Sequence, residues 1–172
     1  KWHDGKPLTT NDILFTINMI RDGEGVVPED IRSFWTEVDV KTLSETTIQF
    51  RLEEPFAPFL DYLSFGILPE HLLGTLSFEQ MIDSGFNLQP VGSGPYAFEG
   101  LITENNQIKG VVLRANQDYF DEPPLIEQMV FQYYDNSSEA LKAFQDGLVL
   151  GISKVEASIL GEVLIDPDLA LY

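Results

Sequence analysis

Few residues of this 172-residue chain could carry out chemistry. The chain has no cysteine, which excludes a thiol nucleophile, a disulfide framework and zinc sites built on cysteine. Its two histidines, His3 and His71, are far apart in the sequence, so neither forms a metal-binding pair with another histidine three or four residues away. A role in a turn, or a hydrogen bond at the end of a helix, is the alternative for these two side chains.

Acidic residues are abundant, and several are paired, as in Glu53-Glu54, Asp121-Glu122, and Asp166 with Asp168. A general acid and base need two carboxyl groups in environments that separate their pKa values, which a sequence does not reveal. With 28 acidic residues, pairs arise by chance, and solvated surface acids are the simpler interpretation. The sequence also lacks a G-x-S-x-G motif, a phosphate-binding P-loop, an H-E-x-x-H motif and a calcium loop. We therefore predict no catalytic residue, no metal site and no cofactor.

Aromatic pairs are the remaining candidates for a binding surface. Phe34-Trp35 follows a charged loop that contains glycine, and Tyr133-Tyr134 ends a stretch rich in β-forming residues. Exposed aromatic side chains can line a binding cleft, whereas buried ones form the core. Gly92 and Gly94 lack a third glycine, and Pro95 follows them, so they do not match a dinucleotide-binding fingerprint.

The charge of the chain disfavours two classes of partner. Ten basic residues against 28 acidic ones give a formal charge of −18, and residues 1–88 and 89–172 contribute equally to it. A surface this negative repels nucleic acid backbones and anionic lipids, although it attracts cationic ligands. No apolar run approaches the roughly 18 residues that cross a bilayer. We therefore predict neither nucleic-acid binding nor direct insertion into a membrane.

The elements that must position these residues alternate between helices and hairpins. Helical spacing predicts a helix that begins after Thr9 and ends near Gly23, followed by a surface loop over 22–32. Alternating apolar residues predict hairpins over 38–52 and 96–114. Further helices are predicted over 59–65, 69–73, 77–85, 137–147 and 155–162, and further strands over 126–134, 148–152 and 162–172. This pattern is typical of an α/β or mixed α+β fold, with a bend at 88–95 as the lobe boundary.

Five motifs follow one another along the chain. Residues 1–13 read K-W-H-D-G-K-P-L-T-T-N-D-I, and the first predicted hairpin runs into E-P-F-A-P-F at 54–59. Residues 67–73 read I-L-P-E-H-L-L, and residues 90–96 read P-V-G-S-G-P-Y. Residues 114–120 read R-A-N-Q-D-Y-F, before a strand that begins L-I-E-Q-M-V-F. In this order, the motifs closely resemble those of the bacterial extracellular solute-binding proteins of family 5, the peptide- and nickel-binding components of ABC importers.

The resemblance implies a periplasmic-binding-protein-like fold of type II, present in part. Members of the family are much longer and close two lobes on a ligand, so the resemblance implies an internal fragment. Residues 1–88 would form a small accessory lobe, and residues 89–172 would form part of the first main lobe. The implied protein is a monomer that is periplasmic or anchored at the cell surface. It would capture a small solute, first of all a peptide, and deliver it to an ABC permease without catalysing a reaction.

The resemblance also suggests where a ligand would lie. We expect the loop 24–35 and the bend 92–96 to face the cleft, with Ser33, Phe34, Trp35, Gly92, Ser93 and Gly94 as ligand-binding residues. Core packing of Phe34 and Trp35, and a rigid lobe junction at Gly92–Gly94, are the alternatives. For the whole chain, the alternatives are an acid-dependent hydrolase and a peptide-binding interaction domain without a transport role.

Overall fold

The computed structural model describes residues 1–170, whose contacts divide the chain into two units. The first unit contains residues 1–98 and 115–127, and the second contains residues 99–114 and the chain from residue 128. The predicted lobe boundary at the bend 88–95 stays a prediction beside this division by contacts. Both helices and hairpins are present, as the predicted mixed class requires.

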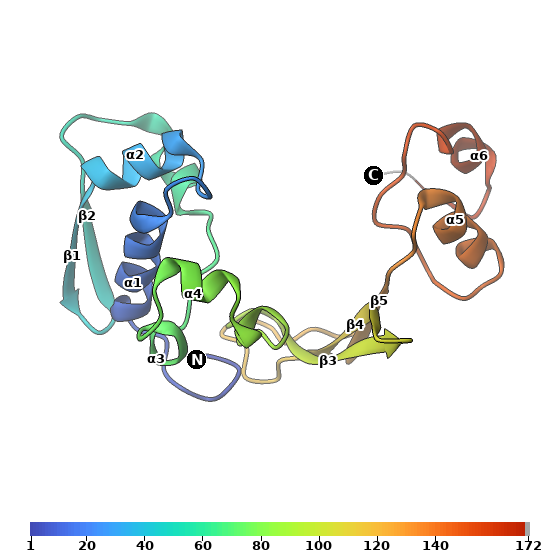
Figure 1. Cartoon of the computed structure of the whole chain (residues 1–172), viewed down its shortest axis with the longest axis horizontal. Helices are drawn as coiled ribbons and strands as arrows, with labels where there is room; N and C mark the ends of the chain where they lie inside the picture. Colours follow the sequence, from blue (N-terminus) through green and yellow to red (C-terminus); the bar gives the residue numbers. More distant parts are fainter. Residues whose placement is uncertain (171–172) are drawn as a thin grey trace. The chain divides into compact units, whose positions relative to one another are not determined.

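Helix α1 (Thr10–Asp22) forms the core of the first unit. It begins after Thr9, as the sequence predicts, and its first turn carries a capping box in which Thr9 and Asp12 bind each other's backbone amides. The side chain of Ile17 on this helix is fully buried against Trp35 and Val38, and partly buried apolar residues surround these three. Packed around α1 are α2 (Glu29–Glu37), β1 (Asp39–Ser44) and α3 (Glu70–Leu73) (Figure 1).

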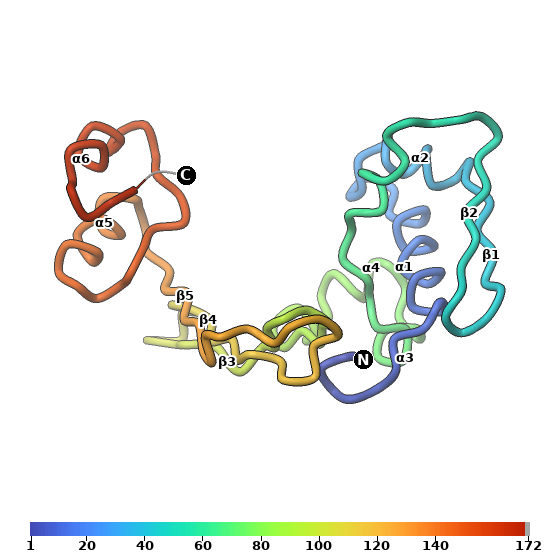
Figure 2. The backbone as a smooth tube through the Cα atoms, turned by 180° about the vertical axis from the view of Figure 1, so that it is seen from behind, coloured from blue at the N-terminus to red at the C-terminus, as the bar shows by residue number. Residues whose placement is uncertain are grey.

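The first predicted hairpin is confirmed by β1 and β2 (Thr47–Arg51), which lie beside α1 in both views (Figure 2). Val40 pairs with Phe50, and both side chains pack on the core of the first unit. Alternate side chains of a strand point to one face, so this register turns the apolar face of the hairpin toward α1. The rest of the unit contains the 3₁₀ helices η1 (Ala57–Leu63) and η2 (Gly85–Asn87) and the helix α4 (Phe78–Ile82).

Helix α2 corrects the predicted loop, because the helix begins inside it, at Glu29. Pro28 precedes the first turn, where Glu29 and Asp30 complement the helix dipole. Ile31, Phe34 and Trp35 stand at the three- and four-residue spacing of a helical face, and all three pack into the core. This spacing indicates a helix, but the prediction of a loop relied on the number of charged residues and glycines in the segment instead.

The second unit contains most of a sheet in the order β3–β4–β5, formed by β3 (Tyr96–Glu104), β4 (Gln107–Ala115) and β5 (Gln128–Gln132). The predicted turn is confirmed by Asn105 and Asn106, whose φ angles of 50° and 62° are tolerated better by Asn than by most residues. Strands β4 and β5 pair antiparallel. A Cβ atom at Gly110 would collide with the Phe131 carbonyl oxygen, so this close pairing requires glycine.

Helices α5 (Ser137–Gln145) and α6 (Leu160–Ile165) complete the second unit. Leu141, Ile159 and Val163 form their shared core, and the Asn136 side chain caps α5 by accepting a hydrogen bond from the Glu139 amide. The predicted strand at 148–152 is wrong, because Leu148 and Leu150 are exposed and no strand pairs with them among residues 1–170. The predicted strand at 162–172 is wrong where it overlaps α6, and its last two residues lie outside the described part of the chain. An apolar run favours a strand, but only pairing with a neighbour forms one.

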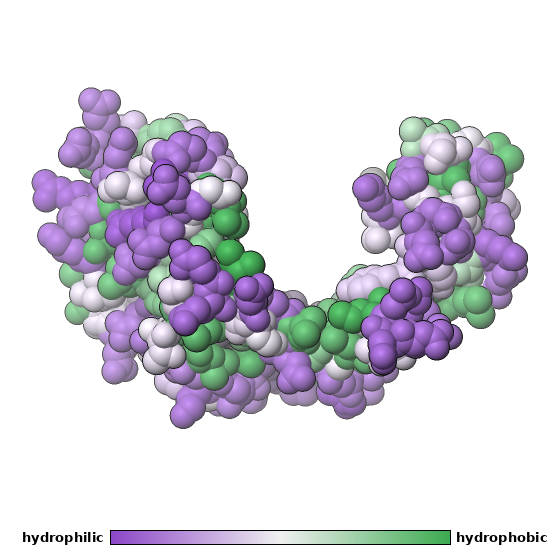
Figure 3. All heavy atoms as spheres, viewed as in Figure 1, coloured by the Kyte–Doolittle hydropathy of each residue, from purple (hydrophilic) through white to green (hydrophobic). Residues whose placement is uncertain are grey.

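Large hydrophobic side chains remain exposed in the second unit. On the face seen in Figure 3, hydrophobic residues gather over the β3–β5 sheet. Exposed residues in the sheet or directly after it are Ile108, Val130, Phe131 and Tyr133, and exposed residues on α6 are Leu164 and Ile165. None of the helices within residues 1–170 has the length and apolar character needed to cross a membrane.

Candidate functional site

Four sequence motifs meet in the first unit, in what we call the motif junction. It consists of the N-terminal turn and the first half of α1 (residues 2–16), the segment 67–71, the bend 90–96 and residues 115–118. These segments are far apart in the sequence, yet direct hydrogen bonds join them. The junction is therefore a polar site that segments distant in the sequence build together.

Asp12 and Thr16 fasten the segment 67–71 to α1. The Asp12 carboxylate accepts a hydrogen bond from the Glu70 amide at 2.9 Å, in addition to the one from Thr9. The Thr16 hydroxyl donates to the Asp12 carbonyl oxygen at 2.7 Å and accepts from the Leu68 amide at 2.8 Å. Both side chains are buried, so these bonds satisfy polar groups that water does not reach.

Asp4 and His71 join the N-terminal turn to α3. His71 Nε2 lies 2.7 Å from one Asp4 carboxylate oxygen, and the Lys6 amide donates to the other at 3.1 Å. Burial tends to raise the pKa of Asp4, but the hydrogen bonds from His71 and Lys6 outweigh it and hold that pKa below its usual value. Beside this pair lies Trp2, which is 2% exposed and whose indole N–H has no hydrogen-bond partner among residues 1–170.

His3 joins the N-terminal turn to the glycine-containing bend. Its backbone amide donates to the Gly92 carbonyl oxygen at 2.8 Å. Its imidazole lies between the Gly92 amide, 3.2 Å from Nδ1, and the Gly94 carbonyl oxygen, 3.0 Å from Nε2. A Cβ atom on Gly92 would stand 3.2 Å from His3 Cε1, so the close approach of ring and backbone favours glycine. The hydroxyl of Ser93 has no hydrogen-bond partner within the described chain.

Asn116 brings the last segment to the same bend. Its side-chain amide donates to the Gly94 carbonyl oxygen at 3.1 Å, and its backbone amide donates to the Pro95 carbonyl oxygen at 2.8 Å. The Asn116 side-chain oxygen accepts from the Asp118 amide at 3.0 Å. Gly94 is thus held from two sides, by His3 and by Asn116, which supports the interpretation of a fixed bend.

The other predicted site residues lie on α2, away from the bend. Trp35 is 1% exposed and packs edge-on against Phe50 and Phe65, so its side chain belongs to the core. The half-buried Phe34 ring lies 4.2 Å from the Tyr62 ring, between centroids, and also contacts Phe56 and Phe59. Ser33 is exposed, and its hydroxyl donates to the Glu29 carboxylate at 3.0 Å. Among the described residues, no hydrogen bond or ring contact joins these three residues to Gly92–Gly94.

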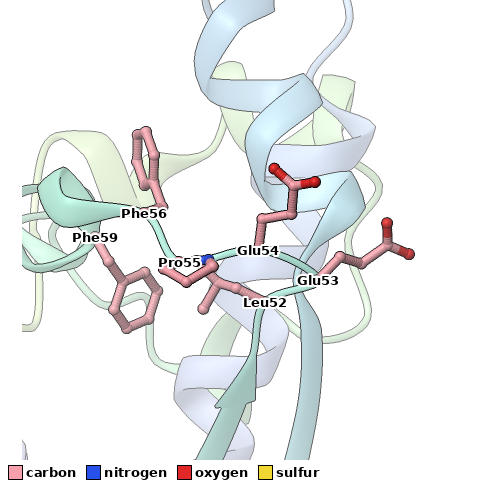
Figure 4. A pocket seen from close by; sticks show the side chains of 6 residues that line it. All are labelled: Leu52, Glu53, Glu54, Pro55, Phe56 and Phe59. Atoms are coloured by element: carbon pink, nitrogen blue, oxygen red, sulfur yellow. The ribbon is translucent and has the colours of Figure 1, made fainter.

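A shallow hollow of about 430 Å³ borders the aromatic residues that contact Phe34. In Figure 4, the rings of Phe56 and Phe59 extend to opposite sides of the chain, and the side chains of Glu53 and Glu54 extend to the same side of it. The hollow is lined by Leu52, Glu53, Glu54, Pro55, Phe56 and Phe59. Residues 1–170 contain no group of three His, Asp or Glu side chains that could hold a metal ion.

The family model described as "Bacterial extracellular solute-binding proteins, family 5 Middle" matches residues 1–170. The chain belongs to this family. A Brucella ovis protein, named for ABC transporter peptide binding, is 31% identical over 151 residues, which cover 86% of this chain and 27% of that protein. The oligopeptide-binding protein AppA of Bacillus subtilis is 29% identical over 152 residues, with the same coverage. The chain thus spans 27% of the length of these curated relatives.

Solved structures agree with the fold of family 5 solute-binding proteins. NikZ from Campylobacter jejuni, in complex with Ni(L-His), has a TM-score of 0.75 at 25% identity, over 96% of this chain and 32% of NikZ. AppA from Bacillus subtilis, in complex with a nonapeptide, has a TM-score of 0.70 at 25% identity, over 87% of this chain and 29% of AppA. These similarities confirm the predicted mixed fold of a periplasmic binding protein, present in part.

In this family 5 chain, the sequence predicted the motifs but not the hydrogen bonds that join them. His3 does lie in a turn and His71 lies in a short helix, as the alternatives for them proposed. The imidazole contact with the bend and the Asp12 contact with Glu70 were not predicted. Each spans more than 50 residues of sequence, so no local pattern could have revealed it.

Proposed function

We propose that this chain is part of a solute-binding protein that captures a small ligand by closing two lobes and passes it to an ABC permease. The family match over residues 1–170 is the observation that carries the proposal. The family description is extracellular, and the protein accordingly acts outside the cytoplasm, in the periplasm or at the cell surface. A ligand closes the lobes when it binds the closed state more tightly than the open state, and this requires no covalent chemistry.

We propose a peptide as the ligand. The names of the Brucella ovis relative and of AppA refer to peptide binding, and the AppA structure holds a nonapeptide. The NikZ structure holds a nickel–histidine complex, so a metal chelate is the alternative ligand to compare with peptides. The strongly acidic chain would favour peptides with basic side chains over acidic ones.

Two groups of residues are proposed to face the ligand. At the bend, the unpartnered Ser93 hydroxyl and the backbone of Gly92 and Gly94 offer polar contacts to a peptide. On α2, exposed Ser33 and half-buried Phe34 offer a polar and an apolar contact, and buried Trp35 supports the Phe34 ring. We assign residues 1–88 to the accessory lobe and residues 89–172 to part of the first main lobe.

The protein is proposed to act as a monomer and without catalysis. Its relatives are solute-binding proteins, and the motif junction contains hydrogen bonds between structural groups rather than an activated nucleophile. A net charge of −18 also opposes association between copies.

Calorimetric titration tests the proposal. The whole solute-binding protein that contains this sequence is titrated with di- to pentapeptides, a nickel–histidine chelate and oligosaccharides, and the 172-residue chain is measured beside it. We expect saturable peptide binding by the whole protein and weak or no binding by the chain alone. Mass spectrometry of the mixtures shows whether the ligand is altered. Formation of a product, or tight binding by the 172-residue chain, would contradict the proposal.

A further inference from the structure

The hydrogen bonds of His3 select one protonation state of its imidazole. The Gly92 backbone N–H can only donate, so Nδ1, 3.2 Å away, must accept and carry no proton. The Gly94 carbonyl oxygen can only accept, so Nε2, 3.0 Å away, must donate and carry the proton. The bend is therefore bound by a neutral imidazole with its hydrogen on Nε2.

A second proton on this ring would break one of the two bonds. It would place an Nδ1–H against the Gly92 N–H, and two donors cannot bind each other. The Gly94 contact with Nε2 would persist, and Asn116 would still hold Gly94.

Within residues 1–170, no charged group forms a hydrogen bond or an ion pair with the imidazole of His3. The groups bonded to it are backbone groups of Gly92 and Gly94, and the side chain that shares Gly94 is the neutral Asn116. No carboxylate oxygen of residues 1–170 lies within 4.0 Å of a His3 ring nitrogen. Charged residues within three positions of His3 are Lys1, Asp4 and Lys6, and Asp118 lies two positions after Asn116. The Asp4 carboxylate binds His71 and the Lys6 amide instead.

We infer that His3 is a positioning residue that fixes the Gly92–Gly94 bend only while its imidazole is neutral, so that acid loosens the bend. Under the proposed function, ligand binding would weaken in acid where the bend meets the ligand. That consequence rests on the proposed function, whereas the state of the bend does not.

The test uses nuclear magnetic resonance on the 172-residue chain, whose two histidines give two imidazole signals. At pH 8, we expect nitrogen shifts of a His3 ring that is protonated on Nε2 alone. Between pH 8 and pH 5, the protection of the Gly92 amide against hydrogen exchange should fall about tenfold, the effect of losing one hydrogen bond. The Glu70 amide, bound by Asp12 in the same unit, is the internal reference and should change far less.

Three variants separate positioning from mere packing. His3→Gln offers an acceptor to Gly92 and a donor to Gly94 without titrating, so it should keep Gly92 protected at both pH values. His3→Leu should lose the protection at both. His71→Gln removes the other imidazole and keeps a donor for Asp4, and it should leave the response of Gly92 to acid unchanged.

A His3 ring protonated on Nδ1 at pH 8 would overturn the inference. So would a Gly92 amide whose protection, relative to Glu70, is the same at pH 5 and pH 8, or a His3→Gln variant that is as sensitive to acid as the original chain. Should His3→Leu fail to fold, the tautomer of the original chain and the His3→Gln variant still decide the question.

Discussion

Asp12 shows how one side chain can serve two elements at once. Its carboxylate caps α1 through the Thr9 amide and also binds the Glu70 amide at the start of α3. A side chain at this third helical position that only completed the capping box would be replaceable by Glu or Gln, which accept the same local bond from the Thr9 amide. A carboxylate with two oxygens aimed at two segments is not replaceable in this way, because a shorter or neutral side chain leaves one buried amide without a partner.

Replacing Asp12 by Ala should therefore cost more than an ordinary cap. We expect Asp12→Ala to lower the free energy of unfolding by about 2 kcal/mol, the sum of a lost cap and an unsatisfied buried amide. Urea denaturation followed by the fluorescence of Trp2 and Trp35 measures this change. Asp22→Asn, at the exposed end of the same helix, is the matched control and should change the unfolding free energy by less than about 0.5 kcal/mol. Equal effects of the two substitutions would refute the double role.

Asp4 gives the N-terminal turn a dependence on pH with a defined sign. Because the pKa of Asp4 is lowered in the fold, its contribution to stability is complete above the unfolded value of about 3.9 and disappears as the pH falls through the folded value. Asp4→Asn should thus be less stable than the original chain at pH 5, and the difference should shrink toward pH 2. Urea midpoints at a series of pH values measure it; a difference that grows in acid would contradict the assignment.

At the scale of elements, the β3–β5 sheet is held by one carboxylate as well as by its ladder. Glu99 on β3 binds the Arg114 guanidinium on β4 and the Gln128 side-chain amide on β5. The hydrogen bond from Arg114, followed by that from Gln128, keeps the pKa of Glu99 below its usual value. A side chain that binds both other strands restricts the register of the sheet. The apolar residues of this sheet restrict the register only weakly, because many of them are exposed.

Removing this charge should loosen the edge strand before the rest of the sheet. We expect Glu99→Gln to speed hydrogen exchange of the β5 amides by about two- to fivefold, as for other exposed charge pairs. The same loss should occur in the original chain as the pH falls through the lowered pKa of Glu99, and not above the usual glutamate value. Glu104→Gln, at the exposed end of β3, serves as the control and should leave β5 exchange unchanged.

At the scale of the whole molecule, charge dominates. A chain with 28 acidic and ten basic residues repels itself in the folded state, where the charges are closest. The described ion pairs are few and mostly exposed, as in Glu29 with Arg32 and Asp39 with Lys41, so they compensate little of this repulsion.

Salt should therefore stabilise the protein. Raising sodium chloride from about 0.01 M to about 0.5 M shortens the screening length from about 30 Å to a few ångströms and should raise the melting temperature. Calorimetry or circular dichroism measures the shift, and potassium chloride at equal ionic strength should give the same result if screening is the cause. A melting temperature that falls with salt would mean that attractive ion pairs outweigh the repulsion.

Local sequence patterns predicted most elements correctly. The start of the first helix after Thr9 and both hairpins depend on neighbouring residues alone, so spacing and turn chemistry were sufficient. Helix α2 carried a readable apolar face that the surrounding charges obscured. The strand expected at 148–152 could not be judged in the same way, since whether an apolar run pairs depends on which strand lies beside it.

By itself, the sequence determined the order of the motifs, and with it the family, because motif order is a property of the chain alone. It also determined the acidic character of the surface, since charge is set by composition. Only the tertiary structure decided that Asp12 binds the Glu70 amide, that Trp35 lies in the core, and that the imidazole of His3 binds the backbone of the bend at Gly92. These contacts join residues distant in sequence, and their energy depends on distances of a few ångströms that folding alone creates.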